Sequence, residues 1–273
     1  MRHTLSTIAH VAVYALAVLG SLYPLIWMLA VSFQPANAAF ELPPKLIFVP
    51  ELSNYRKVLG DSAFVSSIVD SLAITVPATL LCVVAGALAG YALSRHRIRR
   101  QGTLTSILVI SRLVPAFAIV IPTFIIYREL DLLDTRVGLI LSMAAFQLPI
   151  AVLVMYRIID AIPRSLDEAA LIDGAGVIQL LTRVIVPLVK PGLAASTVLT
   201  FVLIWNEFLF ILVLAGNAVI TLPVTIASFE TERQILWGPI SAASMIAVLP
   251  IILLVLTAQR HLLAGLGLGA VRE

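Results

Sequence analysis

Long apolar stretches alternate with short polar ones along this chain, and the apolar stretches have the length of membrane helices. The hydrocarbon core of a bilayer needs about 20 apolar residues for each helix that crosses it. The pattern therefore predicts an all-α membrane protein in which residues 1–273 form one transmembrane domain with six transmembrane helices. The six segments are 11–33, 66–93, 104–127, 137–156, 193–214 and 240–258.

Composition supports a membrane protein and argues against several other classes. The chain is 60% hydrophobic and 12% charged, whereas soluble domains carry about 25% charged residues. Its net charge of +3 does not indicate nucleic-acid binding, because the basic residues are scattered over loops without interleaved aromatic residues. The single cysteine, Cys82, lies in an apolar run, so one chain can form neither a disulfide framework nor a zinc cluster. No metal site is expected.

The distribution of basic residues predicts the orientation in the membrane. With six spans both termini share a side, and the tails with loops 94–103 and 157–192 carry 11 Lys and Arg residues, against six in the other loops. The positive-inside rule places that richer side in the cytoplasm. Asn54 and Thr231 are then outside. The first apolar run exceeds the roughly 7–15 residues of a signal peptide, so we expect it to be a retained helix.

Proline residues interrupt several predicted spans. Pro24, Pro77, Pro115, Pro122 and Pro149 each free a backbone carbonyl inside the membrane, which a neighbouring group must satisfy. Such helices are typical of bundles with kinks, and kinks often serve moving parts.

The chain lacks the sequence signs of a nucleotide site. No GxxxxGK[ST] pattern occurs, and the "GLGLGA" near the C-terminus follows a membrane helix rather than a strand, so it is not a dinucleotide fingerprint. If the protein uses ATP, another chain must bind it.

A charged island, "EAALIDGAG" at 168–176, stands in the longest predicted cytoplasmic loop. Ser165 and Glu168 have the spacing of a capping box, and Asp167 and Glu168 favour a helix N-terminus, so we expect a short helix to begin at Leu166. Gly174 offers the left-handed conformation that a helix end requires.

A second amphipathic stretch follows this turn from Val177 and continues until Pro187 and Pro191 break it. Two interpretations are open: the island docks another protein, or Glu168 merely caps its helix while the small residues let the loop lie flat. The small residues that would let another backbone approach are Ala169, Ala170, Gly174, Ala175 and Gly176.

At this point the residues resemble a known family. In the signature loop of membrane subunits of bacterial ABC importers, EAA is followed by three residues, Gly, nine residues, and two aliphatics that flank one residue before Pro. The matching positions here are Glu168, Ala169, Ala170, Gly174, Val184, Val186 and Pro187, with valine where Ile and Leu are usual.

Further stretches resemble the second permease of maltose-type (carbohydrate uptake) importers. They are "LSNYRKVL", "SRLVP", "LLDTRVGLIL", "WNEFLF", "TLPVTIASF" and "QRHLLAGLGLGAVRE". The resemblance implies a multi-pass permease in a bacterial cell membrane, surrounded by lipid. It also implies three protein partners: a second permease subunit in a heterodimer, a cytoplasmic ATPase dimer and an extracytoplasmic substrate-binding protein.

The resemblance also implies a role for the charged island. Loop 163–187 would contain a coupling helix in a groove of the ATPase, while this chain binds no cofactor and ATP with Mg belongs to the partner ATPase. The implied coupling residues are Glu168, Ala169, Ala170, Asp173, Gly174, Ala175 and Pro187.

Charged residues inside membrane spans are costly and usually face a bundle interior or a water-filled cavity. Asp70 lies near the outer start of its span, so we expect it to snorkel to the interface. Arg112 lies roughly 10 Å past the cytoplasmic start of its span. A structural ion pair and a part in a cytoplasmic gate are both open for it.

The "WNEF" stretch is a candidate wall of the substrate pathway. Trp205, Asn206 and Glu207 cluster about 20 Å along the fifth span. Sugar sites commonly combine an aromatic face with amide and carboxylate groups. The other interpretation is an aromatic-belt residue beside a snorkelling carboxylate.

Three other function classes are alternatives to a sugar importer. An importer of another solute, such as a glycerophosphodiester or an amino sugar, would share every motif. An intramembrane hydrolase needs a His–carboxylate pair or a serine with a base within the spans, but the four histidines lie in tails, a loop or at span ends. A secondary transporter often has two matching halves or a charged relay, and neither is visible.

Overall fold

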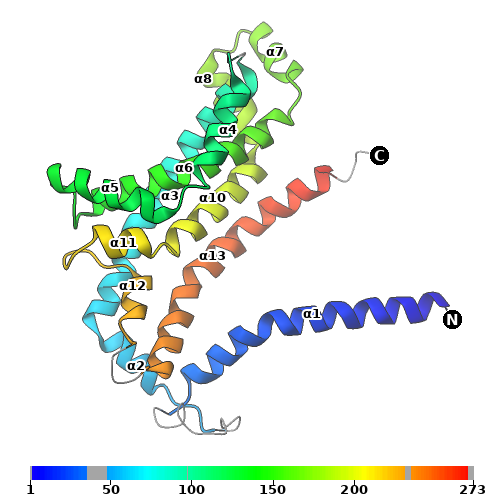
Figure 1. The fold of residues 1–273 in the computed structure, drawn as a ribbon. Coiled ribbons are helices and arrows are strands. Elements are labelled where there is room, and N and C mark those ends of the chain that lie inside the picture. The colour runs from blue at the N-terminus through cyan, green and yellow to red at the C-terminus, as the bar shows by residue number, and fades with distance from the viewer. Residues whose placement is uncertain (1, 36–47, 97, 231–234, 270–273) are drawn as a thin grey trace. The chain divides into compact units, whose positions relative to one another are not determined.

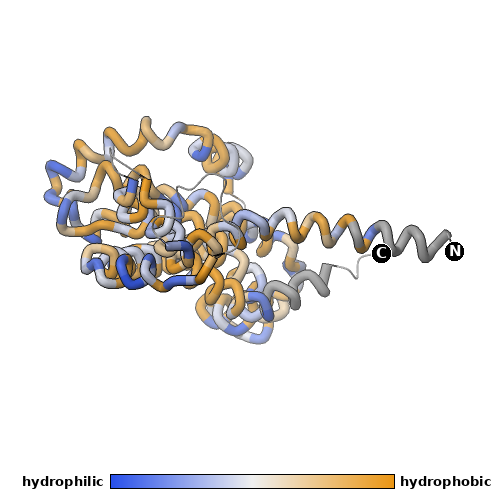
Figure 2. The backbone as a smooth tube through the Cα atoms, turned by 90° about the horizontal axis from the view of Figure 1, so that it is seen from below, coloured by the Kyte–Doolittle hydropathy of each residue, from blue (hydrophilic) through white to orange (hydrophobic). Residues whose placement is uncertain are grey.

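The structure is a computed structural model that describes residues 2–35, 48–96, 98–230 and 235–269. Within these ranges the chain is built from helices, and the only β-type pairing is an isolated bridge between Glu230 and Ile235. The predicted all-α class is confirmed. Hydrophobic residues run along most of the helical backbone (Figure 2).

The helices differ widely in length, as Figure 1 shows. In chain order they are α1 (Arg2–Ser32), α2 (Ser53–Gly60), α3 (Ser62–Arg95), α4 (Gln101–Ser111), α5 (Ala116–Glu129), α6 (Arg136–Asp160), α7 (Ser165–Ile172), α8 (Val177–Gln179), the π-helix η2 (Leu180–Ile185), α9 (Val186–Leu188), α10 (Lys190–Trp205), α11 (Leu209–Leu214), α12 (Leu222–Ala227) and α13 (Trp237–Gly269).

Four of the described helices are long and apolar enough to cross a membrane, and two bent helix pairs bring the count to six if each pair is one span. One pair, Gln101–Ser111 with Ala116–Glu129, is bent by 90°, and the other, Val177–Leu188 with Lys190–Trp205, by 78°. The segment predicted at 104–127 is therefore not one uninterrupted helix, and neither is 193–214, because α10 ends at Trp205 and α11 begins at Leu209. The four long helices are Val13–Ser32, Ser62–Arg95, Arg136–Asp160 and Trp237–Arg260.

The two breaks inside predicted spans have local causes. Pro115 stands immediately before α5 with φ −58° and ψ 136°. It has no N–H to continue α4, and it disfavours helical backbone at the residue before it. The other break lies in "WNEF", where Asn206 ends α10 and the Glu207 carboxylate accepts a bond of 3.2 Å from the Phe210 N–H to start α11. By contrast, the other four prolines lie inside continuous helices: Pro24, Pro77, Pro122 and Pro149.

The chain divides into two compact units, each discontinuous in sequence: residues 1–65 with 225–249, and residues 66–224 with 250–273. In the first unit, Asn54 of α2 donates hydrogen bonds to the backbone carbonyls of Ser32 (3.1 Å) and Gln34 (2.8 Å). These bonds hold α2 against the end of α1, and they leave Asn54 only 3% exposed.

The second unit is organised around close packing of α3 against α6. A Cβ atom added at Gly90 would lie 2.6 Å from the Tyr156 backbone nitrogen, and one at Gly86 would lie 2.9 Å from the Ala151 carbonyl carbon. Backbone approach of this kind is typical of membrane helix pairs with small residues at the contact. The buried core here joins residues of α3, α5, α6 and α11.

Candidate functional site

The charged island forms a helix, a sharp turn and a second helix. Gly174 has φ +82°. Its N–H bonds to the Leu171 carbonyl (3.1 Å), and the Ala175 N–H bonds to the Ala170 carbonyl (3.0 Å). This is the Schellman arrangement that closes a helix C-terminus through a left-handed residue. The left-handed conformation predicted for Gly174 is confirmed.

The capping box predicted at the start of α7 is wrong. The helix begins at Ser165 itself, Arg164 is its N-cap residue, and no side chain caps it. The reason is an extra turn upstream, in which the Leu166 N–H bonds to the Pro163 carbonyl and the Asp167 and Glu168 N–H groups bond to the Arg164 carbonyl. That turn satisfies backbone groups that the capping box would otherwise serve.

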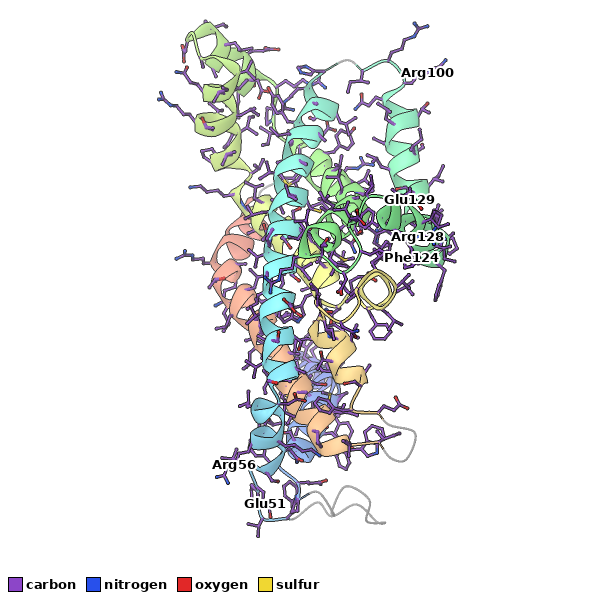
Figure 3. The ribbon with its side chains drawn as sticks, turned by 90° about the vertical axis from the view of Figure 1, so that its left-hand side faces the viewer. Glu51, Arg56, Arg100, Phe124, Arg128 and Glu129 are labelled. Carbon is purple, nitrogen blue, oxygen red and sulfur yellow. The ribbon has the colours of Figure 1, made fainter. Side chains whose placement is uncertain are left out.

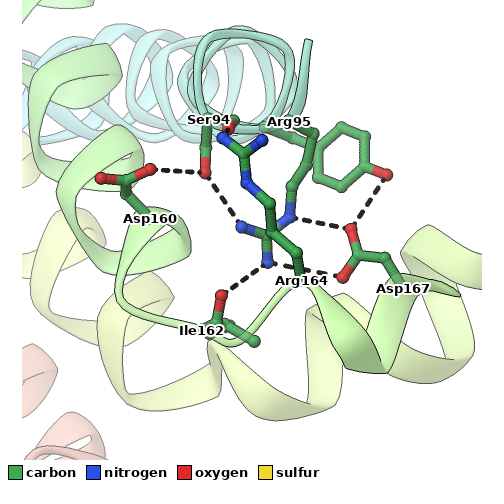
Figure 4. A network of polar contacts seen from close by, with 7 residues as sticks. Ser94, Arg95, Asp160, Ile162, Arg164 and Asp167 are labelled. Carbon is green, nitrogen blue, oxygen red and sulfur yellow. Dashed lines mark hydrogen bonds and ion pairs between the residues drawn. The ribbon is translucent and has the colours of Figure 1, made fainter. Parts of the chain in front are cut away.

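An arginine at the end of α3 anchors α7. The Arg95 Nε atom donates to Asp167 Oδ2 over 2.8 Å, and its Nη2 atom bonds to the Ile162 carbonyl over 3.1 Å (Figure 4). The two ion-paired side chains are 6% and 10% exposed. The start of α7 is thereby tied to a membrane-length helix.

Further bonds surround this ion pair. Ser94 Oγ donates to Asp160 Oδ1 over 3.1 Å, the Arg164 Nη2 atom donates to the Ser94 carbonyl over 2.6 Å, and the Tyr91 hydroxyl lies 3.4 Å from Asp167 Oδ2. From the sequence alone, Asp167 has only a helix-end role and Arg95 does not stand out. The only related signal is the run of basic residues at 94–103.

The helical stretch that follows the island packs on α6, together with Ala170 of the island. Leu180, Ile185 and Val189 are each 2% exposed and join a cluster with Met155 and Ile159. The π-helix η2 carries two of these side chains. It ends where Pro187 has no N–H to donate, and the Val186 N–H bonds five residues back to the Leu181 carbonyl.

The opposite side of the island is exposed and apolar. Relative exposure reaches 85% at Ile172 and 77% at Ile178, and Leu171 and Val177 are exposed as well. We call the exposed residues of 166–178 the turn surface. Nothing in the chain lies within 4 Å of a Cβ added at Gly174 or Gly176, so the turn is open to close approach. The sequence-predicted residues Glu168, Ala169 and Asp173 are exposed on the same element, and Ala170 and Ala175 are half-buried. Pro187 is exposed in α9.

The two breaks in the predicted spans meet through α6. Arg112, directly after α4, donates to the Phe146 carbonyl over 2.6 Å, and its guanidinium lies 4.5 Å from the Phe146 ring centroid. Phe146 in turn packs on Phe210, the residue whose N–H bonds to Glu207 (ring centroids 4.8 Å apart). Among the described residues no ion pair within 4 Å includes Arg112, and its contacts there are a carbonyl and an aromatic ring.

The "WNEF" residues differ in their surroundings. Trp205 is 3% exposed, and its ring stacks on Phe201 with centroids 5.5 Å apart. Asn206 is exposed, and its Nδ2 atom bonds to the Val202 carbonyl over 2.8 Å. Trp205 thus packs within the protein, and Asn206 and the half-buried Glu207 are the more open pair.

A cavity of about 290 Å³ lies beside this junction, between α5, α6 and α11. Hydroxyl and aromatic groups share its wall, including Ser111, Thr123, Tyr127, Ser142, Phe146 and Phe210. The Ser142 hydroxyl is buried and has no hydrogen-bond partner among the described residues. A buried polar group without a partner is costly.

Asp70 does not snorkel, and that prediction is wrong. It is 2% exposed, and its Oδ1 atom accepts bonds from the Arg136 Nε (2.9 Å) and Nη2 (2.8 Å) atoms. The next residue, Ser71, accepts a bond of 2.8 Å from the Leu222 N–H. These contacts tie α3 to the start of α6 and to the start of α12.

A second aspartate clamps the loop after α11. Asp134 accepts bonds from four successive backbone N–H groups, those of Gly216 (2.8 Å), Asn217 (3.1 Å), Ala218 (2.9 Å) and Val219 (3.0 Å). Burial alone would raise the pKa of this carboxyl, but the four bonds lower it below its ordinary value. No pattern in the sequence indicates this clamp.

Replacement of Asp134 by asparagine should loosen that loop. The amide keeps one acceptor oxygen and loses the charge, so we expect amide hydrogen exchange of 216–219 to rise about tenfold, as for a lost bond to a charged group. Because the folded pKa is depressed, the clamp holds above the unfolded pKa of about 3.9 and is lost as the pH falls through the folded value. Asp131→Asn is the control, since Asp131 is exposed and also has a positive φ. Equal exchange in both variants would contradict the clamp.

Comparison with known proteins identifies relatives over nearly the whole chain. The family described as "Binding-protein-dependent transport system inner membrane component" matches residues 82–267. The trehalose transport system permease protein SugB of Mycobacterium tuberculosis is 35% identical over 258 residues, covering 92% of this chain and 93% of the relative. The trehalose/maltose transport system permease protein MalG of Thermococcus litoralis is 32% identical over 255 residues, covering 92% and 91%.

A solved structure is similar throughout. It is the crystal structure of a bacterial ABC transporter involved in the import of the acidic polysaccharide alginate, with a TM-score of 0.77 and 25% identity. The match covers 94% of this chain and 96% of that one.

Proposed function

Since this chain belongs to the family of binding-protein-dependent transport system inner membrane components, we propose that it forms half of a translocation pathway for a sugar. It is a membrane permease subunit of an ABC importer and is not itself an enzyme, because ATP is hydrolysed by partner proteins. We propose in addition a substrate class, the residues of the pathway and of the coupling contact, and the partner subunits.

The observation that carries the coupling role is the turn surface. It is open and apolar at Ile172 and Ile178, while the Arg95–Asp167 ion pair and the packing on α6 fix its underside. A rigid element with an exposed face suits the transfer of motion from a partner. We assign the coupling contact to the exposed residues Glu168, Ala169, Asp173 and Gly174, with Ala170 and Ala175 beneath them and Pro187 ending the loop.

The proposed substrate is a neutral or weakly charged sugar. Relatives at 35% and 32% identity carry names of trehalose and trehalose/maltose systems. The cavity beside Phe146 offers hydroxyl groups and aromatic faces, and these suit the hydroxyls and C–H surfaces of a sugar. Asn206 and Glu207 are the proposed pathway residues, and Arg112 holds the junction between them and the cavity.

The proposed assembly contains a second permease subunit as a heterodimer partner, a cytoplasmic ATPase dimer and an extracytoplasmic substrate-binding protein. ATP and Mg would be bound by the ATPase, and this chain would bind no cofactor. Both termini and the turn surface would face the cytoplasm, as the excess of basic residues supports.

Reconstitution in proteoliposomes tests the function. We expect this chain alone to hydrolyse no ATP, and we expect trehalose- or maltose-stimulated hydrolysis and uptake only with the ATPase, partner permease and binding protein present. Asn206→Ala and Glu207→Ala should reduce uptake without disturbing assembly. If the transporter takes up a glycerophosphodiester and none of the sugars tested, its substrate is not a sugar. If both variants show normal uptake, Asn206 and Glu207 are not part of the pathway.

Cysteine labelling in intact cells tests the orientation. A cysteine at Ile178 should resist an impermeant reagent from outside, whereas cysteines at Glu51 and Asn217 should react. Glu51 is chosen as the labelling position in this loop because Asn54, the position expected to be outside, is only 3% exposed. Asn217 is chosen for the last loop because Thr231 lies outside the described residues. The native Cys82 is 1% exposed and gives little background. Labelling of position 178 from outside would reverse the assigned topology.

A further inference from the structure

A second groove, of about 370 Å³, lies between α4 and α6, away from the cavity described above. It is lined by Thr105, Ser106, Val109, Ile110, Leu153, Tyr156 and Arg157. These residues come from two helices that run in opposite directions across the same half of the membrane. A hydrogen bond of 3.2 Å from Gln101 Nε2 to the Tyr156 hydroxyl joins the start of α4 to the last turns of α6.

The polarity of the groove changes along its length. Arg157 lies at the end of the groove that faces the α3–α4 loop, where the exposed side chains of Arg99 and Arg100 add two further positive charges. Figure 3 shows Arg100 at the start of α4, at the opposite end of the α4–α5 pair from Arg128. One turn deeper are the hydroxyls of Ser106 and Thr105. The Thr105 hydroxyl already donates to the backbone carbonyls of Gln101 (3.2 Å) and Gly102 (3.0 Å), so Ser106 is the more available donor. Beyond them the wall is apolar, formed by Val109, Ile110 and Leu153.

The positive charge of Arg157 is not neutralised within the described part of the chain. Its guanidinium lies 5.6 Å from the Tyr156 ring centroid, and none of the ion pairs there includes it. The nearest acid along α6, Asp160, instead accepts a bond from Ser94 on the side facing α3. The α4 wall is also open, because no residue of α4 is buried.

We propose that this groove binds the headgroup and upper acyl chain of an anionic phospholipid of the cytoplasmic leaflet. The order of groups in the groove, arginine, then hydroxyls, then aliphatic side chains, matches the order of phosphate, ester and acyl chain in such a lipid. Basic pockets between membrane helices on the cytoplasmic side suit anionic headgroups. The groove shares no lining residue with the cavity described above, and only its leaflet rests on the proposed orientation.

Native mass spectrometry of the assembled transporter tests this without sugar or ATP. The probes are phosphatidylglycerol and phosphatidylcholine with identical acyl chains, added to delipidated protein. We expect one phosphatidylglycerol to be retained in preference to phosphatidylcholine. Arg157→Gln should lower its occupancy about fivefold, which corresponds to about 1 kcal/mol for one basic residue near an anionic membrane surface. Arg157→Lys should keep most of the binding.

Two further variants separate a lipid from other ligands. Val109→Trp keeps every charge but fills the apolar part of the groove, so it should also lower retention. Arg128→Gln removes an exposed arginine at the far end of α5 and should have no effect. Equal loss in Arg157→Gln and Arg128→Gln would overturn the proposal, as would full retention in Val109→Trp with displacement by inorganic phosphate. Absence of phosphatidylglycerol from the assembled transporter would mean that a partner subunit covers the groove, and would overturn it too.

Discussion

Gly174→Val should abolish uptake while leaving the protein inserted in the membrane. Gly174 has φ +82°, and a β-branched residue held there costs roughly 1–3 kcal/mol. The Schellman turn would be strained, and the added methyl groups would project into the open space where the proposed ATPase contact lies. A pull-down of the ATPase beside an uptake assay measures both effects. Since insertion depends on the apolar length of the spans, the membrane fraction should contain normal amounts of protein.

Gly176→Val separates backbone strain from bulk at the surface. Gly176 has φ −73°, and a Cβ added there also meets nothing within 4 Å. The variant adds the same side chain two residues away without an unfavourable backbone conformation. If strain dominates, Gly176→Val should retain uptake; if obstruction dominates, both variants should lose the ATPase. Normal ATPase recovery with normal uptake in Gly174→Val would refute the coupling role.

Asp167→Asn should uncouple ATP hydrolysis from uptake. Asp167 and Arg95 form an ion pair whose side chains are 10% and 6% exposed. Removal of one partner from a buried pair costs about 3–5 kcal/mol, because the other charge remains without compensation. We expect α7 to detach from the end of α3 in a large share of molecules. The measurements are hydrogen exchange across 165–172 and the ratio of sugar transported to ATP hydrolysed.

A double variant tests whether the loss of the ion pair is the cause. Arg95→Leu with Asp167→Leu removes both charges, and replacement of a buried pair by apolar residues is often close to neutral. The double variant should therefore be less impaired than Asp167→Asn alone, apart from the lost bond to the Ile162 carbonyl. Arg183→Leu, at an exposed arginine of η2, is the control for charge loss in the same loop. Unchanged exchange and coupling in Asp167→Asn would show that the anchor has no mechanical role.

The sequence by itself determined the class of the protein and the position of the helix–turn–helix loop to which we assign the coupling contact. Apolar length is a local property, so it marks membrane helices before any packing is known. The left-handed turn at Gly174 could also be predicted, because a glycine after a short helix supplies a conformation that other residues adopt at a cost. The residue order from Glu168 to Pro187, which carries the family resemblance, is likewise a local property of the sequence.

Only the tertiary structure decided what those local elements contact. Arg95 and Asp167 are separated by 72 positions, and Asp134 clamps backbone groups more than 80 positions away, so no local pattern could pair them. The breaks after Ser111 and Trp205 were hidden because apolar residues continue on both sides of them. Asp70 was misjudged because its partners reach it from distant segments: Arg136 from the start of α6, and the Ile220 N–H from the loop between α11 and α12. Burial of a charge depends on what packs around it, and that is fixed only when distant segments meet.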